Sequence, residues 1–319
     1  MNQPASLINA RSQGVFVISA TPFTDEGALD LPSVDSLTDF YLAKGASGLT
    51  ILGMMGEASK LTDEESLAMV RRVLARVAGR VPVVVGVSHA SLDQVRRLSH
   101  TAMALGAAGV MLTPVAGLRT DDQVQGYCAA ALHQLGPGVS VCLQDFPQAT
   151  GVYTSVAVIG RLIDEFEQVV MFKHEDMPGL RKLSQLRAAE GSGRRRVSIL
   201  AGNGGLFLPQ ELRRGADGAM TGFAYPEMLA RVCRLHAEGR AAEAEDVYDA
   251  YLPLLRHEFQ YGVGLALRKE VLRRRGAIRS AFVRKPGPVL DAADHADLQW
   301  LMDRLEARIG LLPQVPPHS

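Results

Sequence analysis

The sequence predicts an α/β protein built as a (β/α)₈ TIM barrel with a helical extension at its C-terminus. Eight short apolar runs recur along the first 225 residues, amphipathic segments separate them, and the pattern beyond Pro226 is purely helical. The chain has 319 residues, of which 47% are hydrophobic and 21% charged, so it can bury one large core. We therefore assign residues 1–225 to the barrel and residues 226–319 to the extension.

The apolar runs are nearly continuous rather than alternating, as parallel strands covered on both faces are. Several of the segments between them open with a Ser, Thr or Asp cap, which favours helices. A doubly wound sheet is the competing fold, but no Gly-x-Gly-x-x-Gly turn follows the first run. The expected strands are Gly14–Ser19, Gly48–Gly53, Val81–Val87, Gly109–Thr113, Val139–Gln144, Val169–Lys173, Val197–Ala201 and Gly218–Thr221.

Helices are expected both between the strands and in the extension. The segments between strands include Ser33–Lys44, Thr62–Val77, Ser91–Leu105, Thr120–Leu135 and Pro178–Ala189. In the extension the pattern predicts helices at Pro226–Ala237, Ala241–Arg256, Gly262–Arg275 and Ala292–Ile309, with a frayed tail from Pro313.

Charge and composition exclude several classes of partner. The formal net charge is +0 and the pI about 7.1, which disfavours nucleic acid and anionic membranes as partners. The N-terminus lacks a signal-peptide pattern, and no run approaches the roughly 20 apolar residues that span a bilayer. The three cysteines lack metal-ligand spacing. We expect a soluble cytoplasmic protein without a metal site.

The active site of a barrel lies at the carboxyl ends of its strands, and Lys173 ends the sixth one. The chain has six lysines, and the other five fall in segments that we interpret as surface helices or loops. Burial after an apolar run would lower the pKa of the Lys173 amine and let it attack a carbonyl. The alternative is a lysine that only pairs with Glu175 or Asp176 at the rim.

Four segments around these strand ends resemble one family. They are Thr21-Pro-Phe, Gly48-Leu-Thr-Ile-Leu-Gly-Met-Met-Gly-Glu57, Leu143-Gln-Asp-Phe-Pro-Gln-Ala-Thr-Gly151 and Phe172-Lys173, and their order matches as well. The chain resembles the dihydrodipicolinate synthase and N-acetylneuraminate lyase family of Schiff-base aldolases and dehydratases. That resemblance implies a homo-oligomer, a tetramer or a dimer, whose Lys173 forms a covalent imine with a small 2-oxo acid and which needs no cofactor.

The sequence departs from the family at several site positions. Met54 and Met55 replace two threonines that bind the substrate carboxylate, although the backbone N–H groups from Gly53 onward can still hold one. Gln144 replaces the tyrosine that shuttles protons, and glutamine cannot exchange a proton near neutral pH. Ala149 stands where synthases place an arginine for their second substrate, so condensation in lysine biosynthesis is disfavoured.

A Gln-Asp-x-Pro strand end at Gln144, a Ser-His pair at His89 and Phe-Lys-x-Glu around Lys173 recur together in one branch of the family. In these residues the chain resembles the 2-keto-3-deoxyarabonate dehydratases. We therefore favour dehydration of a 2-keto-3-deoxy sugar acid, with Lys173 as the imine-forming residue. Glu175 and His89 are candidates for the base that removes the C3 proton. Gln144 completes the catalytic set. The substrate-binding candidates are Gly53, Met54, Met55, Asn203, Thr221 and Gly222, whereas Glu57 is interpreted as a structural partner of its own turn.

Three other readings remain open. A retro-aldolase that releases pyruvate from the same substrate class shares the imine, so the sequence barely separates it from a dehydratase. A dihydrodipicolinate synthase is the second. A non-catalytic sensor of 2-oxo acids is the third, because the proton-relay residues of the family are replaced.

Overall fold

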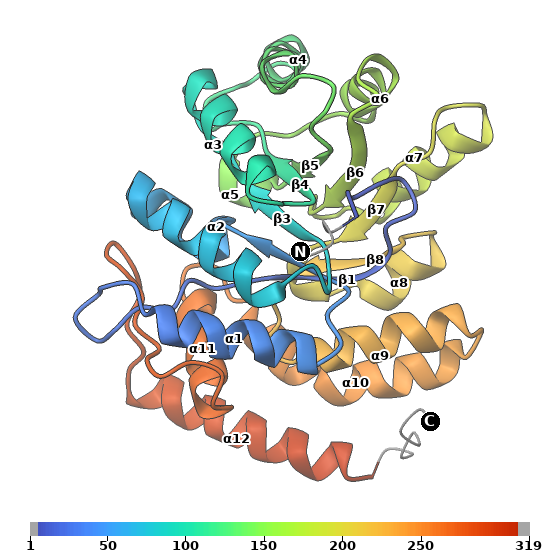
Figure 1. Cartoon of the computed structure of the whole chain (residues 1–319). Helices are drawn as coiled ribbons and strands as arrows, with labels where there is room; N and C mark the ends of the chain where they lie inside the picture. The colour runs from blue at the N-terminus through green and yellow to red at the C-terminus, as the bar shows by residue number, and fades with distance from the viewer. Residues whose placement is uncertain (1–5, 312–319) are drawn as a thin grey trace.

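The computed structural model describes residues 6–311, and their centre is a closed barrel of eight parallel strands in sequential order (Figure 1). All eight predicted strands are present, which confirms the TIM barrel. The Pro313 tail lies outside the described residues. The strands are β1 (Gly14–Ile18), β2 (Gly48–Ile51), β3 (Val83–Gly86), β4 (Gly109–Leu112), β5 (Val141–Asp145), β6 (Val169–His174), β7 (Ser198–Ala201) and β8 (Gly218–Thr221).

The segments that connect one strand to the next form helices, which surround the barrel. Three of them, α5, α6 and α8, lie outside the segments named from the sequence. Helix α6 is rich in Val and Ile, which are weak helix formers, whereas α5 and α8 are only four and six residues long. The helices of this part are α1 (Leu31–Ala43), α2 (Asp63–Val77), α3 (Leu92–Ala104), α4 (Asp121–Leu135), α5 (Pro147–Thr150), α6 (Val156–Glu165), α7 (Leu180–Gly191) and α8 (Leu208–Arg213), with short 3₁₀ turns η1 (Met54–Gly56), η2 (Ala58–Lys60) and η3 (Asn203–Gly205).

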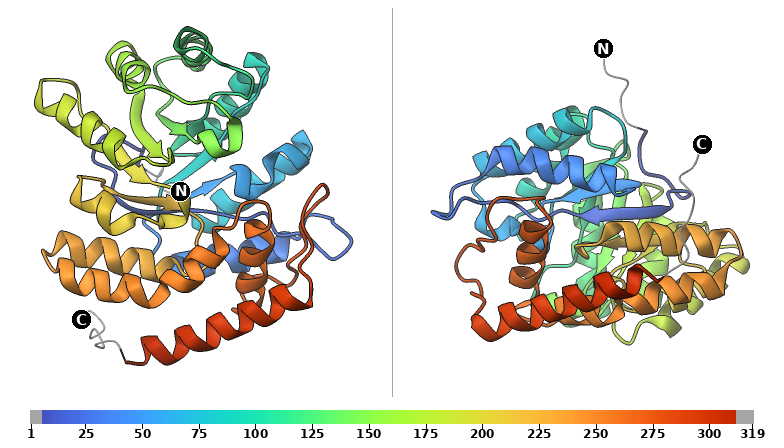
Figure 2. Two further views of the ribbon diagram at one scale, coloured as in Figure 1. Left: turned by 180° about the vertical axis from the view of Figure 1, so that it is seen from behind. Right: turned by 90° about the horizontal axis from the view of Figure 1, so that it is seen from below.

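In the described part of the chain, four helices follow β8. They are α9 (Pro226–Ala237), α10 (Ala241–Glu258), α11 (Gly264–Arg274) and α12 (Ala292–Ile309). Helix α9 contacts β1 and β8, so the ring of helices around the barrel continues beyond residue 225. Figure 2 shows α10 stacked on α9, with α12 outside it. Among the described helices, none is both long enough and apolar enough to cross a membrane.

The strands separate an inner cluster of side chains from an outer one. Inside the barrel, Met171 of β6 packs with Cys142, Leu200 and Met220, whereas Phe172 belongs to the cluster between strands and helices. Because successive side chains of a strand point to opposite faces, Lys173 lies on the inner side above Met171. The barrel therefore presents Lys173 at the carboxyl end of its interior, where the sequence places the site.

Candidate active site

Lys173 and Glu175 form a buried ion pair at the carboxyl end of β6. Lys173 is 4% exposed and Glu175 5% exposed, and Lys173 Nζ lies 2.8 Å from Glu175 Oε2. Gln144, the register partner of Lys173 on β5, donates from Nε2 to the same carboxylate oxygen at 2.6 Å. The structure thus brings together three of the four predicted catalytic side chains, Lys173, Glu175 and Gln144.

The end of β7 fixes the other oxygen of that carboxylate. The backbone N–H of Asn203 donates to Glu175 Oε1 at 3.2 Å. Gly202, the preceding residue, has room for nothing larger than hydrogen, because a Cβ there would lie 1.9 Å from Glu175 Cγ. Sequence reasoning missed this role of Gly202, because the close approach joins the ends of two strands that are 27 residues apart along the chain.

We expect Gly202→Ala to lower turnover by roughly 10²-fold, because a displacement of about 1 Å at a reacting group has that effect. The added methyl group must push the Glu175 side chain away from Lys173. Steady-state kinetics measure the loss, and the matched control is Gly126→Ala in α4, where a Cβ would meet nothing within 4 Å. Equal activity of the two variants would show that Glu175 need not occupy this position.

A glutamine that follows β5 supports the loop after β6. In the amide orientation that satisfies both ends, Gln148 donates to the backbone carbonyl of Glu175 at 2.8 Å and accepts from the N–H of Met177 at 2.9 Å. Thr113, at the end of β4, donates from Oγ1 to the backbone carbonyl of Gln144 at 3.1 Å. The backbones that carry Gln144 and Glu175 are therefore held on both sides.

Asn203 offers the site an unused polar group. Its side chain is 4% exposed, its backbone has a positive φ of 49°, and its Oδ1 atom is buried without a hydrogen-bond partner among the described residues. A buried acceptor without a partner is costly, so such an atom at a site favours a ligand or a water that donates to it. Thr221, 4% exposed at the end of β8, stays a prediction as a substrate contact.

The turn after β2 is tied to the end of β1. Thr21 donates from Oγ1 to the carbonyl of Gly56 at 2.6 Å. Met54 is 43% exposed on this turn, whereas Met55 packs on the inner cluster of the barrel. The sulfur of Met55 occupies space that a Cβ on Gly222 would need, since the two would be 2.2 Å apart. Met55 and Gly222, both predicted substrate contacts, therefore lie against each other at the mouth of the barrel.

Glu57 has partners beyond its own turn. Its Oε2 accepts from Lys60 Nζ and from the N–H of Arg284, both at 3.0 Å, and its Oε1 accepts from Lys269 Nζ at 2.5 Å. Lys269 is 0% exposed, so the prediction that every lysine other than Lys173 lies at the surface was wrong. Its ammonium is buried because it pairs with Glu57 and with the carbonyl of Phe282, which an amphipathic pattern does not reveal.

His89 is apart from this group. Its side chain is exposed in the loop after β3, its Nδ1 accepts from the N–H of Ser91 at 2.9 Å, and its carbonyl accepts from the hydroxyl of Tyr127. No described contact joins His89 to Lys173 or Glu175. Its part in proton transfer stays a prediction, and Glu175 is the candidate base that the geometry supports.

Behind β5 and β6 lies a second set of ionisable groups. Burial raises the pKa of Asp145 to about 6, although Lys182 Nζ lies 2.6 Å from its Oδ2 and lowers it in part. Burial also lowers the pKa of His174 to about 4, so this residue is neutral at pH 7. His174 Nε2 lies 3.0 Å from the carbonyl of Gly179, so a neutral ring donates there. These groups face the helices, as the alternation along β6 requires.

Glu211 of α8 is a further buried carboxylic acid. It is 4% exposed, and burial raises its pKa from 4.5 to about 8, with the charge of Glu175 adding to the increase. Glu211 is therefore protonated at neutral pH. In that state it adds no second negative charge beside the Lys173–Glu175 pair.

We expect Glu211→Gln to remove a fall in stability between about pH 4.5 and pH 8. The folded state holds this proton more tightly than the unfolded state, so stability is full below the unfolded pKa and is lost as the pH rises through the folded one. The loss at pH 9 is on the order of 5 kcal/mol, from a pKa that burial raises from 4.5 to about 8. Denaturant unfolding of both proteins at pH 5 and pH 9 measures it, and parallel profiles would contradict it.

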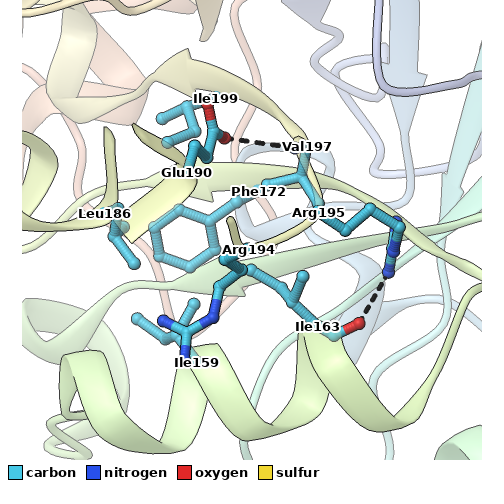
Figure 3. Close-up of a pocket in the computed structure, with 9 residues that line it drawn as sticks. All are labelled: Ile159, Ile163, Phe172, Leu186, Glu190, Arg194, Arg195, Val197 and Ile199. Carbon is cyan, nitrogen blue, oxygen red and sulfur yellow. Dashed lines mark hydrogen bonds between the residues drawn. The ribbon is translucent and has the colours of Figure 1, made fainter. Parts of the chain in front are cut away.

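Among residues 6–311, no group of three or more His, Cys, Asp or Glu side chains is arranged to hold a metal ion. A small pocket lies on the outer face of β6 and β7. Figure 3 shows Phe172 pointing into it, beside Arg194 and Arg195. Lys173 does not line this pocket, because it points to the other face of the strand.

Comparison with known proteins identifies relatives along nearly the whole chain. Residues 11–304 match the dihydrodipicolinate synthetase family. An L-2-keto-3-deoxyarabonate dehydratase of Azospirillum brasilense is 34% identical, over 93% of this chain and 95% of its own. A probable 2-dehydro-3-deoxy-D-pentonate aldolase of Escherichia coli K12 is 29% identical over 76% of this chain and 80% of its own.

A solved structure confirms the architecture. The crystal structure of a dihydrodipicolinate synthase from Rhodopseudomonas palustris matches with a TM-score of 0.92 and 43% identity, over 94% of this chain and all of that one. The family match, the identities and the shared barrel agree. The chain therefore belongs to the dihydrodipicolinate synthetase family, and it is a lyase.

Proposed function

We propose that the protein dehydrates a 2-keto-3-deoxy sugar acid through an imine on Lys173. The observation that carries the proposal is the Lys173–Glu175–Gln144 cluster, in which an amine, a carboxylate and an amide meet where the family resemblance places a proton-shuttling tyrosine. The name of the Azospirillum relative, a dehydratase of this substrate class, supports it.

Imine formation needs a neutral amine. Glu175 Oε2, 2.8 Å from Lys173 Nζ, takes a proton from the ammonium. The free amine attacks the C2 carbonyl, and the carbinolamine hydroxyl leaves as water with the proton that Glu175 returns. Glu175 is again a carboxylate, and the product is a protonated imine.

The same carboxylate then serves the elimination. The protonated imine withdraws electrons from C3, so Glu175 can remove a C3 proton and form an enamine. The enamine expels the C4 hydroxyl, which leaves as water with that proton. Gln144 donates to Glu175 and holds it in place. The backbone N–H groups of Gly53, Met54 and Met55 would hold the C1 carboxylate, while Asn203, Thr221 and Gly222 would contact the rest of the substrate.

The remaining properties belong to the same proposal. We expect a cytoplasmic homo-oligomer, a tetramer or a dimer, that takes a small 2-oxo acid and uses no cofactor beyond the covalent imine. Retro-aldol cleavage is the second candidate function, because an aldolase stands among the relatives and shares the enamine.

Borohydride trapping tests the proposal. The protein is incubated with pyruvate and with 2-keto-3-deoxy sugar acids, reduced, and mapped by peptide mass spectrometry. A reduced adduct on Lys173 is expected. Products then separate the reactions, since cleavage releases pyruvate and an aldehyde whereas dehydration gives a dioxo acid. Formation of dihydrodipicolinate from pyruvate and aspartate semialdehyde would support a synthase instead. No adduct in folded protein would overturn the imine and favour a sensor.

A further inference from the structure

Arg268 of α11 carries a buried charge to the mouth of the barrel. Its side chain is 9% exposed, and its Nη1 lies 2.6 Å from the sulfur of Met55. A thioether is a weak hydrogen-bond acceptor, and a guanidinium is a strong charged donor. The charged end of Arg268 therefore faces an acceptor that satisfies it poorly.

The other contacts of Arg268 leave most of its donors unused. Its Nε donates to Glu258 Oε2 at 3.1 Å, and among the described residues Glu258 and Met55 are its only hydrogen-bond partners. A guanidinium has five N–H donors. Glu258 compensates the charge, which allows the arginine to be buried, but it leaves the donors of both terminal nitrogens without an oxygen.

The position of Met55 places this guanidinium beside the substrate turn. Met55 belongs to η1, whose backbone N–H groups are the proposed holder of the carboxylate. Its side chain packs on the inner barrel cluster and lies against Gly222 at the end of β8. The terminal nitrogen of Arg268 therefore lies next to the mouth between β1 and β8, on the same side of the barrel as the proposed carboxylate.

The helix that carries Arg268 is fixed to the same turn. The next residue, Lys269, is 0% exposed and bonds to Glu57, which directly follows η1. A movement of α11 would therefore break a buried ion pair. Met55, in contrast, is an unbranched side chain with three rotatable bonds, so it can change conformation without a backbone shift.

We propose that Arg268 is a second contact for the carboxylate of the 2-oxo acid, and that Met55 covers it until substrate binds. The proposal rests on the imine function above. The substrate carboxylate replaces the thioether and accepts hydrogen bonds from the terminal nitrogens of Arg268. The C-terminal extension would in this way contribute directly to the selection of an acid over a neutral ketone.

The test compares two probes that differ in the carboxylate. Borohydride trapping on Lys173 is measured against concentration for pyruvate and for hydroxyacetone, a neutral ketone of similar size. In the double variant Arg268→Gln/Glu258→Gln, which removes both buried charges together, we expect the half-saturating pyruvate concentration to rise roughly 10- to 100-fold, as for loss of a charged hydrogen bond. Trapping of hydroxyacetone should change less than about twofold, because that probe offers the guanidinium no charge.

Two further variants keep the test decisive. Arg268→Lys retains the charge beside Glu258 but not the planar guanidinium, so we expect a smaller rise in the half-saturating concentration of pyruvate and no change for hydroxyacetone. If the double variant does not fold, Arg268→Lys is the variant that tests the proposal. Arg275→Gln is the matched control, because Arg275 bonds to the carbonyl of Ala224 and to Glu227. Its pyruvate to hydroxyacetone ratio should equal that of the unaltered protein.

The outcomes separate this proposal from the one it rests on. An unchanged ratio in folded Arg268 variants, with trapping intact, would overturn the role of Arg268 and leave the imine function standing. Equal losses for both probes would assign Arg268 to structure only and would overturn the proposal as well. Failure of the unaltered protein to trap any 2-oxo acid would instead refute the proposed function. In that case calorimetric titration with pyruvate still decides whether Arg268 binds the carboxylate.

Discussion

Lys173→Arg is expected to abolish the borohydride adduct and to lower turnover by at least roughly 10⁴-fold, because no imine can form on a guanidinium. Arginine at position 173 keeps a positive charge beside Glu175. In the unaltered protein the Lys173 amine lies 2.8 Å from the Glu175 carboxylate. The loss can then be assigned to the missing nucleophile, since the buried charge pair persists. Intact-protein mass spectrometry after reduction and steady-state kinetics measure the two effects.

Lys173→Met is the informative companion of this variant. It removes the nucleophile and also leaves Glu175 as a buried carboxylate without its cation, which we expect to cost on the order of 3–5 kcal/mol of stability. Similar stabilities of the two variants would show that Glu175 is neutral or otherwise compensated. An adduct at another lysine in either variant, with turnover retained, would contradict the assignment of the imine to Lys173.

The sequence predicts the barrel well because each buried strand is a nearly continuous run of apolar residues. All eight apolar runs became strands, and the ends of α9 and α12 were also predicted correctly. The position of Lys173 at the end of an apolar run is likewise a local signal. A residue two positions later on an extended chain points to the same side, and the pair between Lys173 and Glu175 agrees with this expectation.

Contacts between distant segments were not predictable in the same way. Lys269 lies in a helix whose sequence, Leu-Arg-Lys-Glu, is typical of a polar surface. Lys269 is nevertheless fully buried, where it pairs with Glu57, 212 residues earlier. The roles of Arg268 and Gly202 also depend on residues that are distant along the chain. The role of a buried charge or of a glycine can be inferred only when the residue that it contacts in the fold is known.

Glu57 has both a contact that the sequence predicts and contacts that it does not. Its interpretation as a structural partner of its own turn agrees with its contact to Lys60, three residues later. The contacts to Lys269 and Arg284, however, make the turn a junction between the barrel and the C-terminal segment. The extension thus contacts the turn that is proposed to hold the substrate, which explains why it cannot be treated as a simple appendage.

Glu175→Gln is expected to lower dehydration by roughly 10²- to 10⁴-fold, because this is the usual contribution of a general base. The amide retains the size of the carboxylate, and its one oxygen can accept either from Gln144 or from the N–H of Asn203, which bond to different oxygens of Glu175. It cannot take a proton from C3. Adduct formation with pyruvate should persist, if more slowly, so kinetics and borohydride trapping together separate imine formation from elimination.

Exchange of the C3 protons locates the lost step. In D₂O the unaltered protein should exchange the methyl protons of pyruvate through the enamine, and Glu175→Gln should slow that exchange in parallel with turnover. Asp176→Asn is the matched control, because that carboxylate is adjacent along the chain but pairs with Lys182 instead of Lys173. A Glu175→Gln variant that exchanges and dehydrates at the normal rate would transfer the base role to another group. His89, the remaining predicted candidate, would then have to approach Lys173 from the exposed loop after β3.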